Sequence, residues 1–183
     1  MQQALSIEER DFGPVHAAVA DTLNELGNAA SMRDDYAAAE ERFQRVADIY
    51  RSIYGERHYL VAIALSNVAY VKLNRKDYAG AEVGFRDVVR RFTETLGAGN
   101  VNTGIAHIKL GRTLLREQRF ADAAKQTRAG YDNLSAQTNP GISFLQAARK
   151  DLAAEYEALG ESQLAQRFRL ELTSNDPQAQ AGH

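Results

Sequence analysis

The 183-residue chain has 22 basic and 24 acidic side chains, and its formal net charge of −2 provides no overall field for nucleic acid or an anionic membrane. The absence of cysteine excludes disulfides, thiolate metal sites and cysteine nucleophiles. The N-terminus has no secretory signal pattern, and the longest apolar run, YLVAIAL, is far shorter than the ~20 residues of a membrane helix. We therefore expect a cytoplasmic protein.

Helix-favouring residues and the spacing of apolar side chains predict helices along almost the whole chain. Residues 1–13 align with the ends of later helices, because ALSIEERDF (4–12) matches VADIYRSIY (46–54). We predict that they complete a repeat that begins before the chain, and that the chain is a piece of a longer protein. The polar residues 174–183 are predicted to be a disordered tail. The expected helices lie near 15–32, 35–54, 58–74, 77–96, 101–117, 119–136, 141–159 and 161–172.

The predicted helices repeat with a period of 42 residues, because Tyr36, Tyr78 and Phe120 are spaced 42 apart (78 − 36 and 120 − 78). Small residues recur in the same phase, and glycines mark the joints between repeats. The small residues are Gly27, Ala69, Gly111 and Ala153 in one series and Ala39, Ala81, Ala123 and Ala165 in another; the joint glycines are Gly13, Gly55 and Gly97.

Each period contains two helical patterns. Gly27 opposite Ala39 allows two antiparallel helices to approach closely, while Tyr36 and Phe43 fill the space beside them. A single helix pair cannot bury its own apolar face, so neighbouring pairs must stack. The sequence therefore predicts an all-α solenoid of about four antiparallel helix pairs.

The pattern LNELG followed by YAAAEERF, and LSNVA followed by YAGAEVGF, resembles the tetratricopeptide repeat. The 42-residue period and the G-x-x-H joint are similar to the kinesin light chain type. The resemblance implies a right-handed superhelix over residues 14–173. Its expected repeats are 15–56, 57–98, 99–138 and 139–173.

A second resemblance concerns the end of the array. LGRTLLREQRFADAAKQTRAGYDNL, followed by FLQAARKDLAAEYEALGESQLAQRFRLEL, is similar to the C-terminal repeats of some bacterial serine/threonine protein kinases. Of the kinase motifs, the Gly-rich loop and HRD do not occur in this sequence, and the DFG tripeptide at residues 11–13 stands without them. Kinase activity would therefore belong to another part of a longer chain.

His16 and His58 occupy the same position in two successive joints and suggest a metal site. Equivalent positions of stacked repeats lie about 10 Å apart, whereas zinc needs nitrogens about 2 Å from the ion. The third joint has Asn100, so a polar side chain that caps the next helix explains all three residues. His107 takes the position of inward-facing leucines and is expected to be semi-buried. No metal, cofactor or catalytic residue is predicted, and we expect no enzyme.

The tetratricopeptide resemblance implies that the first helix of each pair lines a concave surface whose outward polar positions contact a peptide. The matching positions are Asn24 and Asn28 in the first repeat, Asn67, Tyr70 and Asn74 in the second, and Lys109, Arg112 and Arg116 in the third. The three basic residues, spaced i, i+3, i+7, gather on one helix side and favour an acidic peptide or a terminal carboxylate. A solvated basic helix face is the alternative interpretation.

These observations predict a non-catalytic protein-interaction scaffold that binds an extended or acidic peptide segment, without nucleic acid or membrane partners. Two alternatives stay open. The module could self-associate end to end, through residues 1–13 and the fourth pair, as a homo-oligomer. It could also be an accessory, substrate-docking region of a larger signalling protein such as a bacterial serine/threonine kinase.

Overall fold

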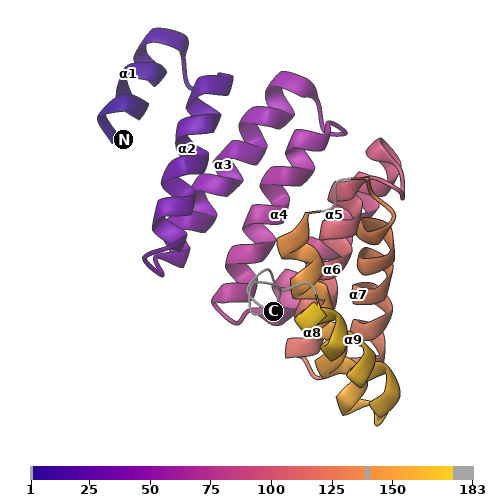
Figure 1. Ribbon diagram of the computed structural model, residues 1–183. Coiled ribbons are helices and arrows are strands. Elements are labelled where there is room, and N and C mark those ends of the chain that lie inside the picture. Colours follow the sequence, from indigo (N-terminus) through magenta and orange to yellow (C-terminus); the bar gives the residue numbers. More distant parts are fainter. Residues whose placement is uncertain (1, 139–140, 175–183) are drawn as a thin grey trace, which may run out of the picture. The chain divides into compact units, whose positions relative to one another are not determined.

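The computed structural model describes residues 2–138 and 141–174, which form nine helices and no strand (Figure 1). This confirms the all-α fold, and each predicted helix from residue 15 onward is present within three residues of its expected ends. The predicted tail lies outside the described residues, apart from Ser174 at the end of α9. The helices are α1 (Gln2–Phe12), α2 (Ala17–Ser31), α3 (Tyr36–Tyr54), α4 (Tyr59–Asn74), α5 (Tyr78–Leu96), α6 (Val101–Arg116), α7 (Phe120–Ser135), α8 (Ile142–Ala158) and α9 (Ser162–Ser174).

The chain divides into two compact units, an N-terminal unit of residues 1–96 and a C-terminal unit of residues 97–183. In the N-terminal unit each helix packs against the next in sequence, from α1 to α5 (Figure 1). In the C-terminal unit α6 packs on α7, α7 on α8 and α8 on α9, and α6 also contacts α8. Each unit is therefore built from stacked helix pairs, as the repeat predicts. No helix within 2–138 or 141–174 is both long and apolar enough to cross a membrane.

The three joints that lead into a first helix share one backbone conformation. Gly13, Gly55 and Gly97 have φ values of +83°, +88° and +90°, and Gly55 combines this with ψ 161°. Only glycine adopts this region without steric cost. The joints therefore require glycine, which explains why it recurs every 42 residues.

A second series of turns connects the two helices of each pair. Asp34, Lys76 and Gln118, which are again 42 residues apart, have φ values of +60°, +69° and +61°, and Gly160 continues the series at +75°. The short left-handed turn is followed by a cap in the first two repeats, where the Asp35 and Asp77 side chains accept hydrogen bonds from Ala38 N and Gly80 N.

Close approach of paired helices depends on the small residues that the repeat conserves in phase. A Cβ added at Gly27 would lie 2.7 Å from Cε1 of Phe43, whose side chain is buried with Ala30 and Ala39. Tyr36 packs against the same cluster. The core of the C-terminal unit is a separate cluster that includes Ile108, Leu134, Leu152 and Phe168. This confirms the prediction that Tyr36 and Phe43 fill the space beside Gly27.

Candidate functional site

The joint histidines are helix caps. His16 Nδ1 accepts a hydrogen bond from Ala18 N at 3.2 Å, and His58 Nδ1 accepts one from Leu60 N at 3.3 Å. Asn100 Oδ1 does the same for Asn102 N at 2.9 Å. Each imidazole also stacks on the aromatic residue four positions earlier, Phe12 or Tyr54.

The capping interpretation is therefore confirmed, because all three side chains satisfy backbone N–H groups that a helix start would leave unpaired. His107 is half-buried, with Nδ1 2.8 Å from Gln126 Oε1, as expected for a packed polar side chain. Within the part of the chain that the structure describes, no three His, Asp or Glu side chains gather in a way that could hold a metal ion.

The predicted peptide-contact residues of the N-terminal unit lie on α2 and α4. Asn67 Nδ2 donates a hydrogen bond to Asn24 Oδ1 at 3.2 Å, which connects two successive first helices. Asn28 and Tyr70 are exposed, whereas Asn74 is half-buried. Each of the two paired amides keeps further donor or acceptor capacity, since an amide group offers two N–H donors and two acceptor lone pairs.

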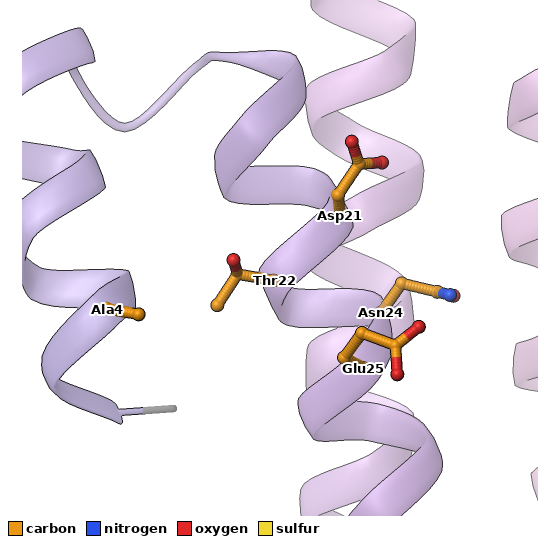
Figure 2. A pocket seen from close by; sticks show the side chains of 5 residues that line it. All are labelled: Ala4, Asp21, Thr22, Asn24 and Glu25. Atoms are coloured by element: carbon orange, nitrogen blue, oxygen red, sulfur yellow. The ribbon is translucent and has the colours of Figure 1, made fainter.

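Next to this pair is a pocket of about 330 Å³ between α1 and α2. Figure 2 shows Thr22 directed towards Ala4 of α1, while the polar ends of Asp21, Asn24 and Glu25 point away from α1. Asn24 is the only predicted contact residue in this lining. Asp21 and Glu25 were not predicted as contact residues, although their spacing of four residues places both carboxylates on one helix face.

The three basic residues of α6 have different surroundings. Arg112 Nε and Nη2 both lie 2.8 Å from Oδ2 of Asp151, which comes from α8. Lys109 is half-buried, and burial, together with the positive charge of Arg112, lowers its pKa from 10.5 to about 8. Arg116 is exposed. The stripe on α6 therefore consists of an exposed cation, a cation oriented by an ion pair and a partly desolvated lysine.

Behind this stripe lies a buried polar group that the sequence did not predict. Glu155 of α8 is 0% exposed, and its Oε1 accepts a hydrogen bond from Thr127 Oγ1 of α7 at 2.8 Å. Burial raises the pKa of Glu155 from 4.5 to about 8, and the neighbouring Asp151 contributes in the same direction. Burial also raises the pKa of Asp151, against the opposing effect of Arg112. The Arg112–Asp151 and Thr127–Glu155 contacts therefore connect α6 and α7 with α8.

Comparison with known proteins agrees with this architecture. Two models of the tetratricopeptide repeat match residues 1–52 and 61–102. No curated protein matches the chain.

Three solved structures have a similar fold. A protein of Podospora anserina described as a kinesin light chain with nearly identical TPR-like repeats has 17% identity and a TM-score of 0.74, over 100% of this chain and 85% of that one. A point variant of the same protein has 16% identity and a TM-score of 0.76, over 99% of this chain and 85% of that one. BtubC (BKLC) of P. vanneervenii has 16% identity and a TM-score of 0.78, over 96% of this chain and 73% of that one.

At this level of identity the likeness to these structures shows the fold alone, and it confirms the predicted resemblance to kinesin light chain-type arrays. Folds of this kind generally mediate protein–protein interactions and are typically non-catalytic. The residue pattern, the helix pairs and the matching family models lead to one conclusion: this chain carries tetratricopeptide repeats, in residues 1–52 and 61–102, within a fold like that of kinesin light chain-type proteins.

Proposed function

We propose that the chain is a non-catalytic cytoplasmic interaction module that binds an acidic or extended segment of a partner protein through the polar faces of its first helices. The observation that carries the proposal is the arrangement on α6. Arg116 is exposed there, and Arg112 is held in place by Asp151 on the same helix side. Oriented guanidinium groups bind carboxylates with less loss of side-chain freedom than mobile ones.

Lys109 adds to this preference for negative charge. Its ammonium form is destabilised by burial and by Arg112. A carboxylate brought beside it would offset both effects, because an opposite charge favours the ionised form. In the N-terminal unit, Asn24, Asn28, Asn67, Tyr70 and Asn74 offer donors and acceptors to the backbone of an extended peptide, whatever its sequence.

The test is the anisotropy of a fluorescent oligoglutamate peptide titrated with the full chain. Arg116→Ala and Lys109→Met should each weaken binding by about two- to fivefold, as expected for loss of one partly exposed charge pair. Arg128→Ala is the matched control, since Arg128 lies in the same unit on the second helix α7 and pairs with Asp132. Equal affinity of all four proteins, or no binding by the unmodified chain, would refute the proposal.

Self-association is a second candidate, and the exposure of α1 favours it. Ile7 is 51% exposed, whereas Ile49, 42 residues later at the same repeat position, is 3% exposed. Phe12 and Val15 add exposed apolar surface nearby. Sedimentation velocity at several concentrations separates the two candidates, because Ile7→Ser should abolish any dimer while leaving oligoglutamate binding unchanged.

An accessory docking role within a larger signalling protein, such as a bacterial serine/threonine kinase, rests on sequence resemblance alone. Reading the coding sequence upstream of this chain tests it. A kinase domain in the same reading frame would support this role, and a stop codon directly before residue 1 would exclude a kinase domain that precedes the chain.

A further inference from the structure

Glu155 is unusual for its place in the repeat. The equivalent residues 42 and 84 positions earlier are Thr113 and Val71, both buried. Its partner Thr127 likewise stands where the two preceding repeats have Phe43 and Phe85. A buried carboxyl thus stands where the earlier repeats have threonine or valine, and a buried hydroxyl stands where they have phenylalanine.

The hydrogen bonding of Glu155 is incomplete. Thr127 binds Oε1, but among the described residues Oε2 has no hydrogen-bond partner although it is shielded from solvent. A neutral carboxyl tolerates such a site far better than a carboxylate does, because burial of an unpaired charge costs much more than burial of a polar group.

The charged groups around Glu155 come from α6 and α8. Asp151, one turn earlier on α8, repels a carboxylate at Glu155, and Arg112 of α6 attracts it. From α7 the facing polar group is the Thr127 hydroxyl. Arg112 also repels Lys109, while Arg116 and Lys150 attract Asp151. Arg112 is therefore the cation to which an ionised Glu155 would turn.

We propose that Glu155 is a proton-operated switch in the C-terminal unit: when it releases its proton to solvent, Arg112 is drawn inward from Asp151 and from the outer face of α6, and the packing of α8 against α6 and α7 loosens. In the protonated state Arg112 stays with Asp151 at the edge of the stripe. Burial places the pKa of Glu155 at about 8, so the switch operates slightly above neutral pH.

The switch itself does not depend on the proposed function, but its consequence for peptide binding does. Arg112 has five N–H donors, of which the Nε and Nη2 groups are directed at a single oxygen of Asp151. Sharing the guanidinium with a second carboxylate moves positive charge inward. An acidic peptide should therefore bind more weakly when Glu155 is ionised.

The direct test follows the carboxyl ¹³C resonances of the glutamates of the unmodified full chain as pH is raised. One glutamate should titrate near pH 8, well above the usual range of a glutamate carboxyl. Glu155→Gln should remove that resonance, and Glu157→Gln should not, because Glu157 is exposed on the same helix. The absence of any glutamate that titrates above pH 6 would overturn the switch, and this result needs no variant.

Hydrogen exchange of the full chain tests the structural consequence. The unmodified chain is compared with Glu155→Gln at each pH, so that the intrinsic exchange rate cancels. Relative to the variant, the opening constant of α8 should rise by up to about tenfold per pH unit from 4.5 towards 8 and then level off. Identical protection of α8 in both proteins throughout this range would contradict the proposal.

Oligoglutamate binding separates the two claims. If a glutamate titrates near pH 8 and the affinity falls above that pH less in Glu155→Gln than in the unmodified chain, both hold. If the titration is present but neither protein binds oligoglutamate, the switch stands and the proposed function is wrong. If both proteins bind with the same pH dependence, Glu155 does not control Arg112 and that part of the inference is wrong.

Discussion

Replacement of Gly111 by alanine tests the close approach of α6 and α7. A Cβ built at Gly111 would lie 2.1 Å from Thr127 Oγ1, 2.8 Å from Thr127 N and 3.1 Å from Ala123 O. Two of these atoms belong to the backbone of α7, so no side-chain rotation can relieve the overlap. The helices would have to separate, and the loss of packing would extend along both.

The expected change in stability is the sum of one stabilising and two destabilising effects. Alanine favours the helix over glycine by about 1 kcal/mol. Overpacking of a close helix contact costs about 1–3 kcal/mol. Displacement of Thr127 would also remove the hydrogen bond to buried Glu155, which costs about 1–3 kcal/mol more. We therefore expect Gly111→Ala to destabilise the C-terminal unit by about 3 kcal/mol.

The assay is urea denaturation of the full chain, combined with hydrogen exchange of α6 and α7 to assign the change to the C-terminal unit. Gly99→Ala is the control, because a Cβ there would meet no atom within 4 Å and the backbone is not left-handed. It should change stability by less than about 0.5 kcal/mol. A Gly111→Ala chain as stable as the original, or more stable, would refute the close-packing argument.

Two further predictions concern the caps and the partly buried lysine. His58→Ala should lower the thermal stability of the N-terminal unit by about 1 kcal/mol, and His58→Asn should largely restore it, because asparagine caps α6 at the equivalent position 100; equal melting of the two variants would contradict the capping role. Because folding lowers the pKa of Lys109 from 10.5 to about 8, the unfolded chain binds more protons between these values, and stability should rise by up to about 1.4 kcal/mol per pH unit over that range. Lys109→Met should lack this rise in pH-dependent denaturation, and a rise that persists in the variant would assign it to another group.

The helix pairs and the glycine joints could be predicted from the sequence because each depends on a residue type that recurs every 42 positions. Gly13, Gly55 and Gly97 adopt a backbone region that glycine alone enters freely. The cap interpretation of His16 and His58 succeeded for the same reason, since Asn100 at the third joint performs the same task.

The left-handed turns between paired helices could not be predicted in this way. Asp34, Lys76 and Gln118 share a positive φ but have no side-chain chemistry in common. Of the four residues in this series, only Gly160 is of a type that indicates a left-handed backbone. The surrounding helix ends, and not the residue itself, impose this conformation.

The surroundings of the basic stripe could not be predicted from the sequence either. Its spacing placed Lys109, Arg112 and Arg116 on one side of a helix, but the pairing of Arg112 with Asp151 joins residues 39 positions apart on different helices. The buried Thr127–Glu155 contact occurs at positions where this repeat differs from the earlier ones. A periodic pattern predicts the features that recur, so it could not predict this contact.

The most direct test of the proposed function is the hydrogen-exchange footprint of oligoglutamate on the full chain. We predict protection in α6, residues 101–116, that decreases at high salt and in Arg116→Ala, since interactions between exposed charges are screened by salt. Protection confined to other helices, or binding that is indifferent to both salt and Arg116, would contradict the assignment of α6 as the surface that recognises negative charge.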